Sequence, residues 1–491
     1  MEKRRITTYI IIWFIIILIW FLFCYGKLEE AYYSYSSVGS LTVTKETEET
    51  QIQENTMEKA KADEIKTEET YKRENNTENT AKDNTENVTE TESEETMTRN
   101  TMLPAKTDSN IRVLLLNDQG NVYHDEIILE HRKETLHITE SSPYFQKTDK
   151  IRISKMSSFE EGIKVLSINK MYGNPVYEGV LEIQKEEEGL ILVNELSLET
   201  YVKGVLPGEM SAGFPMEALK AQAVCARTYA MMKKAEPAYP NYNAIVDDSI
   251  SSQVYMYQER SEKTDRAVEE TKSELLYGSD RQLEECYYYS TSCGKSATCH
   301  VWDIDAISKK DKTGSEEVEK EFRAFISNTI DSHLEKNEPF YRWTYETKAA
   351  SDDLYDKCME RNLCDKNYGK IKDIKIICRE NGGAAECMEM VCEKGSFQIL
   401  GEYNIRFVLS QGGNVILKNG KTYDTGELLP SSFLTISCKH NKKGYLTGYE
   451  IIGGGFGHGI GMSQNGAKYM AQAGNNYIEI LQTYYKGSYV K

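Results

Sequence analysis

The pattern of hydrophobic and polar positions changes twice along the chain, and each part predicts a different structure. Residues 6–25 are almost entirely apolar, and this run of about 20 residues is long enough for a helix to cross a hydrocarbon core of about 30 Å. From residue 42 to residue 102 the chain consists mainly of Thr, Glu, Asn and Lys. Such a segment buries too little apolar area to offset its chain entropy, so the sequence predicts a disordered linker over residues 26–105.

From Asn110 onward, short apolar runs alternate with polar turns, which is the pattern of successive β-strands. The predicted strands are IRVLLL, KIRIS, IKVLSI, VYEGVLEIQ and GLILVNELSL, followed later by IKDIKIIC, CMEMVC, SFQIL and SFLTIS. Residues 212–233 change to helical spacing, with Pro215 in the first turn, where proline is tolerated. Further helices are predicted at residues 264–275 and 465–485. Because strands and helices do not alternate regularly, the predicted fold class is α+β: a mixed, β-rich domain over residues 110–491 with one long helix.

The N-terminal segment carries a topology signal. Lys3, Arg4 and Arg5 precede the apolar run, so residues 1–5 are expected in the cytoplasm and the remainder of the chain outside it. A cleaved signal peptide is the alternative. The apolar run is long for a signal peptide, and no A-x-A-like cleavage site follows it, which favours an uncleaved single-pass anchor in the cell membrane.

Charge excludes one class of partner. The chain has 59 basic and 77 acidic side chains, a formal net charge of −18, and residues 46–100 contribute 17 acidic and 7 basic side chains to it. Contacts to phosphates need clustered Lys and Arg, and the sequence has no basic stripe. We therefore expect no nucleic-acid partner.

Ten of the eleven cysteines follow the apolar run. Pairing of Cys358 with Cys364, or of Cys387 with Cys392, and free buried thiols are all consistent with the sequence. Separately, Cys293 and Cys299 lie in STSCGKSATCHVW, and two thiols with a third ligand are a possible zinc site. The third ligand would be Cys286, His300 or a more distant histidine, and unligated or disulfide-bonded cysteines are the alternative.

Glu209 is the first candidate for acid–base chemistry. It lies in VLPGEMSAGFP, between a strand-like segment and the predicted long helix. A carboxyl group at a partly apolar junction can have a raised pKa and act as a general acid. The alternative is a structural carboxylate that interacts favourably with the dipole of the following helix.

Two further groups of polar residues accompany Glu209. Lys220 and Arg227 are seven residues apart, so they project from one face of the predicted helix, where they are either solvated or bind an anionic sugar. His458 lies among seven glycines between positions 453 and 466, with Ser463 and Gln464 close behind. So many glycines indicate positive φ angles or a close approach of the backbone to a ligand.

Four segments in this order resemble the stage II sporulation protein D (SpoIID) family. They are GEMSAGFPMEALKAQAVCARTYAM, DDSISSQVY with the later YYYSTSCGKSA, PFYRWT, and GGGFGHGIGMSQNGAKYMAQAGNNYIEILQTYYKG. The resemblance covers roughly residues 110–491, and a single N-terminal membrane helix is common in the family. Relative to it, segments 305–338 and 348–368 look like surface insertions, and Tyr289 stands where many members have histidine.

The resemblance implies a lytic transglycosylase that cleaves peptidoglycan glycan strands during sporulation. Its substrate would be strands from which a partner amidase has removed the stem peptides, and its setting a membrane-anchored complex that carries out forespore engulfment. The family's catalytic acid matches Glu209. Substrate contacts are implied at Lys220, Arg227, Gln253, Ser290, Ser292, His458, Ser463, Gln464 and Tyr485. Some members bind zinc through the middle segment, which favours Zn²⁺ at Cys293 and Cys299.

Two other functions remain open at this point. The domain would be a non-catalytic module that grips glycan and enhances a cell-wall amidase, in which case Glu209 is not required. Alternatively, it would be a zinc hydrolase built on Cys293, Cys299 and a histidine. The sequence argues for the fold more strongly than for any one activity.

Overall fold

The computed structural model describes residues 41–45 and 110–491, apart from residues 132–133, 156–161, 171–172, 257–258, 314 and 349–350. The predicted membrane span at 6–25 and most of the predicted linker lie outside this part of the chain. Within it, no helix is both long enough and apolar enough to cross a membrane.

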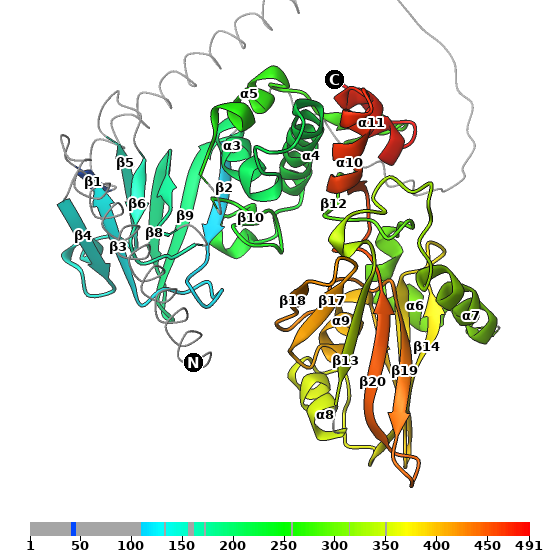
Figure 1. Ribbon diagram of the computed structural model, residues 1–491. Coiled ribbons are helices and arrows are strands. Elements are labelled where there is room, and N and C mark those ends of the chain that lie inside the picture. Colours follow the sequence, from blue (N-terminus) through cyan, green and yellow to red (C-terminus); the bar gives the residue numbers. More distant parts are fainter. Residues whose placement is uncertain are drawn as a thin grey trace, which may run out of the picture. The chain divides into compact units, whose positions relative to one another are not determined.

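The chain forms two compact units where the sequence predicted one folded domain over residues 110–491. The first comprises the chain up to Leu196 together with Asn241–Asp248, and the second comprises Ser197–Pro240 and Ser249–Lys491. Both sheets and helices are present, so the α+β prediction is confirmed (Figure 1).

The first unit is built from two sheets. A six-stranded sheet has the order β1(Leu41–Lys45)-β5(Lys150–Lys155)-β8(Val180–Lys185)-β9(Leu190–Ser197)-β2(Asn110–Leu115)-β10(Val246–Asp247). A four-stranded sheet has the order β4(Glu134–Thr139)-β3(Glu126–His131)-β6(Ile163–Val165)-β7(Val176–Tyr177). Strand β1 lies inside the predicted disordered linker, so that prediction is wrong for residues 41–45. The sequence LTVTK has the β-branched, alternating pattern that suits a strand, and β1 pairs antiparallel with β5.

The second unit begins with a group of helices around α4. Helix α4(Met216–Ala235) matches the predicted long helix, and it packs against α3(Leu198–Glu209), α5(Glu262–Glu270), α10(Gln464–Gln472) and α11(Tyr477–Tyr484). Figure 1 shows the C-terminal helices α10 and α11 beside α4, although they are far apart in the sequence. The predicted C-terminal helix is thus two helices, and Asn476 caps the second with its side chain.

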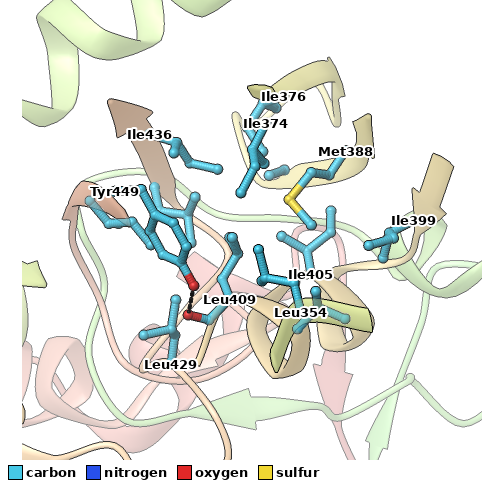
Figure 2. Close-up of a cluster of buried hydrophobic side chains, with 14 of the residues drawn as sticks. Leu354, Ile374, Ile376, Met388, Ile399, Ile405, Leu409, Leu429, Ile436 and Tyr449 are labelled. Carbon is cyan, nitrogen blue, oxygen red and sulfur yellow. Dashed lines mark hydrogen bonds between the residues drawn. The ribbon is translucent and has the colours of Figure 1, made fainter. Parts of the chain in front are cut away.

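The rest of the second unit is mainly sheet. A five-stranded sheet has the order β18(Thr422–Asp424)-β17(Asn414–Leu417)-β13(Trp343–Thr347)-β20(Leu446–Gly453)-β19(Leu434–His440), and a three-stranded sheet the order β14(Ile371–Arg379)-β15(Ala385–Cys392)-β16(Gly395–Leu400). Helices α6(Ile304–Lys309), α7(Ser315–Ile326), α8(Ser351–Glu360) and α9(Glu402–Leu409) accompany them. Side chains of both sheets and of α8 and α9 form the core in Figure 2, where the Tyr449 hydroxyl donates to the Leu409 carbonyl oxygen at 2.7 Å.

The two segments predicted as surface insertions also contribute to the core. Phe322 and Ile326 of α7 and Leu354 and Cys358 of α8 are buried. The prediction is therefore wrong for these residues. Both helices are amphipathic, so the many charged residues that suggested a surface location occupy one face while the other face packs inward.

Candidate active site

Glu209 is the last residue of α3, and the segment before it is helical where the sequence suggested a strand. Tyr201, Val202, Val205 and Leu206 recur at the spacing of a helix face and are buried. The Ser197 side chain accepts a hydrogen bond from the Thr200 amide and so caps the helix. The packed face keeps α3 helical through Pro207 as far as Glu209.

Two segments that are far apart in the sequence meet at this carboxyl group. Strand β12(Tyr288–Tyr289) pairs parallel with β21(Met462–Ser463), so that Tyr288 lies opposite Met462. Ser463 then caps α10, whose first residue is Gln464. This pairing places the side chains of Tyr288 and Gln464 within hydrogen-bonding distance of the Glu209 carboxyl group.

The carboxyl group of Glu209 accepts three hydrogen bonds. Its Oε1 accepts from the Val254 amide at 3.0 Å and from the Tyr288 hydroxyl at 3.2 Å, and its Oε2 accepts from Gln464 Nε2 at 3.4 Å. Burial raises the pKa of Glu209, and the three donors oppose that rise because they stabilise the ionised form. A carboxyl group in these surroundings is able both to release a proton and to take one back.

Glu209 faces a cavity of about 430 Å³ within the second unit. Most of the other lining side chains are aromatic or small: Tyr229, Ile250, Ser251, Ser252, Val254, Cys286, Tyr287, Tyr288, Tyr289, Ser290, Trp302, Phe456, His458 and Gln464. Among the described residues that line it, Glu209 is the only carboxylate, and none is a lysine or an arginine. The cavity therefore offers one acid, hydroxyl and amide groups, and aromatic surface.

The glycine-rich segment brings His458 to this cavity. Gly457, Gly459 and Gly461 have positive φ angles, and a Cβ atom on Gly461 would lie 1.9 Å from the Tyr287 carbonyl oxygen. The predicted need for glycine is confirmed. His458 Nδ1 accepts from the Ile460 amide at 3.1 Å, and burial lowers the pKa of His458 to about 4, so the ring is neutral at pH 7.

The structure brings some of the predicted substrate residues to the cavity, whereas Gln253 does not line it and contacts the lining residue Tyr288. Ser290, His458 and Gln464 line the cavity. Gln253 is buried, and its Nε2 donates to the Tyr288 hydroxyl at 3.0 Å. Gln253 thus orients the tyrosine that donates to Glu209.

Ser292 and Ser463 converge on a buried carboxylate that the sequence did not single out. Glu335 is 2% exposed, and its Oε2 accepts from the Ser292 amide at 2.8 Å and from the Ser463 hydroxyl at 2.7 Å. Burial raises the pKa of Glu335 to about 7. This residue joins the segment after β12 to the start of α10, and it belongs to a charged segment that suggested only surface.

Lys220 and Arg227 do not line the cavity, and the contact with substrate that the resemblance implies for them stays a prediction. Lys220 pairs with Glu270 at 2.7 Å, on α5. Arg227 is fully buried, and its Nε and Nη2 donate to the two carboxylate oxygens of Glu199 at 2.9 and 2.8 Å. Both side chains face α5 from one side of α4, as predicted, and on that side they form ion pairs with carboxylates of neighbouring helices.

Tyr485 is also a structural residue in this arrangement. It is buried, its hydroxyl donates to the Tyr287 carbonyl oxygen at 2.5 Å, and the same hydroxyl accepts from the Met462 amide at 3.3 Å. Tyr485 thus links the segments of β12 and β21, whose pairing positions Tyr288. It does not line the cavity.

The predicted zinc ligands are not gathered into a site. The Cys293 thiol is near the Lys295 carbonyl oxygen, and the Cys299 thiol donates to Glu285 at 3.2 Å. Burial raises the pKa of Cys293 to about 11 and of Cys299 to about 12, whereas zinc binds thiolate. Within the described residues, no three or more His, Cys, Asp or Glu side chains are placed to hold a metal, and the ten cysteines there are free thiols. Zinc at Cys293 and Cys299, with Cys286 or His300, stays a prediction from the sequence.

Comparisons with known proteins bear on the segments that build this site. The stage II sporulation protein (SpoIID) family model matches residues 186–277, and a second model, a domain of unknown function, matches residues 295–461. The first match contains Glu209 and Gln253. The second contains Trp302, Glu335 and His458, so the cavity combines side chains from both.

Three relatives illustrate the similarity. The chain is 29% identical over 296 residues to the amidase enhancer of Bacillus subtilis, covering 58% of this chain and 40% of the relative. It is 28% identical over 373 residues to an uncharacterized protein of Brachyspira hyodysenteriae, covering 74% and 84%. It is 25% identical over 316 residues to stage II sporulation protein D of B. subtilis, covering 61% and 75%. The family match in the segment that carries Glu209, together with these relatives, supports membership of the SpoIID family.

Proposed function

We propose that the protein is a lytic transglycosylase that cleaves peptidoglycan glycan strands at the bond between N-acetylmuramic acid and N-acetylglucosamine. One observation supports the proposal above all: among the described residues that line the cavity, Glu209 alone has a carboxyl group, and burial raises the pKa of that group. A glycosidase that uses water generally needs two carboxylates, one as acid and one as base or nucleophile. A lytic transglycosylase needs one, because the nucleophile belongs to the substrate.

In the proposed reaction Glu209 acts first as acid and then as base. Its protonated carboxyl group donates to the glycosidic oxygen as the bond to the anomeric carbon breaks. The 6-hydroxyl of the same muramic acid then attacks that carbon, the Glu209 carboxylate takes the hydroxyl proton, and the product has a 1,6-anhydro end. The three donors to Glu209 stabilise the carboxylate that exists between the two proton transfers.

The other polar groups of the cavity suit the hydroxyl and acetamido groups of a sugar chain. Ser290 and Gln464 offer hydroxyl and amide groups, and His458 stays uncharged at neutral pH. We further infer, from the resemblance to the SpoIID family, that a partner amidase removes the stem peptides from the glycan before this protein acts.

The cellular setting is part of the same proposal. Two of the relatives are named stage II sporulation protein D, a name that refers to sporulation. We infer that this protein remodels the cell wall during engulfment. The apolar run 6–25 would anchor the chain in the cell membrane, in a complex that includes the amidase. No step of the proposed reaction depends on a metal.

The second candidate function is enhancement of an amidase without cleavage of glycan. It is favoured by the similarity to a protein named amidase enhancer, which this chain matches over 40% of that protein's length. This function requires that the cavity binds glycan, but it does not require the carboxyl group of Glu209. The two candidates therefore differ in what they require of Glu209.

The test compares wild type, Glu209→Gln and the control Glu262→Gln, which changes an exposed glutamate of α5. Each full chain is incubated with peptide-free glycan, and new strand ends are counted without and with a cell-wall amidase. The proposal predicts that wild type and Glu262→Gln produce new strand ends without the amidase, and that Glu209→Gln produces none. Stimulation of the amidase by all three proteins, with no new ends from any of them, would replace the transglycosylase with the enhancer.

A further inference from the structure

Trp302 is an exposed aromatic side chain at the cavity that holds Glu209. It ends the short helix η3(Cys299–Trp302), lines the cavity, and is 38% exposed. The other tryptophan of the described residues, Trp343, is 1% exposed and belongs to the core. Part of the indole surface at the cavity is therefore accessible to a ligand.

The indole ring is held in place from several directions. Its centroid lies 5.0 Å from that of Tyr287 and 5.3 Å from that of His458, both in edge-to-face geometry. Its Nε1 donates to Glu402 Oε1 at 3.4 Å, and the other oxygen of Glu402 pairs with Arg406 at 3.1 Å. A ring fixed in this way loses little conformational freedom when a ligand packs on it.

The polar groups beside the ring show what it would bind. Ser290 and Gln464 present hydroxyl and amide groups to the same cavity, and Tyr287 and Phe456 add aromatic surface. A pyranose ring has this dual character: its axial C–H bonds form an apolar face that packs on an aromatic ring, while its hydroxyl and acetamido groups form hydrogen bonds at the edge. A wholly apolar ligand would leave the hydroxyl and amide groups unused, and a wholly polar ligand would leave the aromatic surface unused.

We propose that Trp302 is the platform of a sugar-binding subsite, on which one N-acetylated hexose ring of the glycan stacks next to the bond at Glu209. The inference rests on the proposed function, since it assigns a second sugar ring to the same cavity. It adds that recognition of the strand, and not the proton transfer, depends on Trp302. A residue from the segment matched by the domain of unknown function thus binds the substrate that Glu209 cleaves.

Tryptophan fluorescence of the full chain tests this directly. A soluble, peptide-free oligosaccharide of alternating N-acetylglucosamine and N-acetylmuramic acid is titrated into Glu209→Gln, which prevents turnover. Of the four tryptophans, Trp13 and Trp20 lie in the apolar run and Trp343 is buried, so a change in emission is expected to come from Trp302. The same titration of the Trp302→Phe double variant should give no such change.

Binding measured independently, by calorimetry, supplies the second readout. Trp302→Ala should raise the dissociation constant about tenfold, and Trp302→Phe should raise it less, because a smaller aromatic ring remains. In turnover, Trp302→Ala should raise KM more than it lowers kcat. Tyr489→Ala is the control, since Tyr489 is also 38% exposed but stacks on Tyr277 and does not line the cavity.

The outcomes separate the subsite from the proposed function. Unchanged affinity in Trp302→Ala, or no change in emission while calorimetry shows binding, would overturn the subsite and leave cleavage by Glu209 standing. Binding with the expected tryptophan signal by a wild-type protein that never cleaves glycan would support the subsite and overturn the transglycosylase. No binding of the oligosaccharide by wild type would overturn both.

Discussion

Glu335 gives the most quantitative prediction, because its burial links stability to pH. The carboxyl group is 2% exposed, and burial raises its pKa from the usual 4.5 to about 7. The folded chain therefore holds the proton more tightly than the unfolded chain does. The resulting contribution to stability is fully present below about pH 4.5 and is lost as the pH rises to about 7.

The size of the effect follows from the shift. About 2.5 pKa units correspond to about 3 kcal/mol of the free energy of unfolding, at about 1.4 kcal/mol per unit. Glu335→Gln keeps an oxygen that accepts from the Ser292 amide and the Ser463 hydroxyl, but its side chain does not titrate. The variant should lack this component of the pH dependence.

Urea unfolding across this pH range provides the assay, with wild type and Glu335→Gln measured in parallel. Other groups also titrate: the lowered pKa of His458 makes stability fall as the pH decreases from 6.5 toward about 4, which opposes the effect of Glu335. The difference between the two proteins cancels these shared contributions. The reasoning is refuted if that difference stays constant between pH 4.5 and 7.

Three further substitutions test separate parts of the site. Tyr288→Phe removes a donor that lowers the pKa of Glu209, so the alkaline limb of the kcat/KM profile should move to higher pH; a move to lower pH would contradict the assigned bond. Arg227→Met leaves Glu199 without its ion-pair partner and should lower the free energy of unfolding, measured in urea, by about 3 kcal/mol, while the folded protein still binds glycan. Unchanged stability with lost glycan binding would instead indicate that Arg227 contacts the substrate. Gly461→Ala meets a backbone carbonyl oxygen at a φ of +73° and should cost about 2 kcal/mol; an unchanged melting temperature would contradict the close approach of Gly461 to Tyr287.

Local sequence pattern predicted the elements whose hydrophobic spacing is clear. The predicted strands β2, β5, β6, β8 and β9 and helix α4 lie where their patterns placed them, whereas β3 and β4 were not predicted. Helix α3 was missed because Val205, Pro207 and Gly208 favour a strand or a turn by local propensity. The buried face of the helix overrides that preference, and this depends on packing partners that local pattern does not reveal.

The site was predictable where chemistry and spacing were local, and not where it depended on long-range packing. Glu209 and the glycine-rich segment stood out by composition, and both lie at the cavity. The spacing of Lys220 and Arg227 correctly placed them on one face of a helix but could not show that α5 covers that face. Glu335 could not be singled out from the sequence, because it lies in a charged segment and its partners Ser292 and Ser463 are distant in the chain.

The most direct test of the central claim is the chemical structure of the new strand ends. Peptide-free glycan is incubated with the full chain in water labelled with heavy oxygen, and the products are analysed by mass spectrometry beside those of Glu209→Gln. If Glu209 catalyses attack by the muramic acid hydroxyl, the wild-type products are 1,6-anhydro ends, one water lighter than hydrolysis products and free of label, and the variant gives none. Labelled, hydrated ends from wild type, or anhydro ends from Glu209→Gln, would contradict the account.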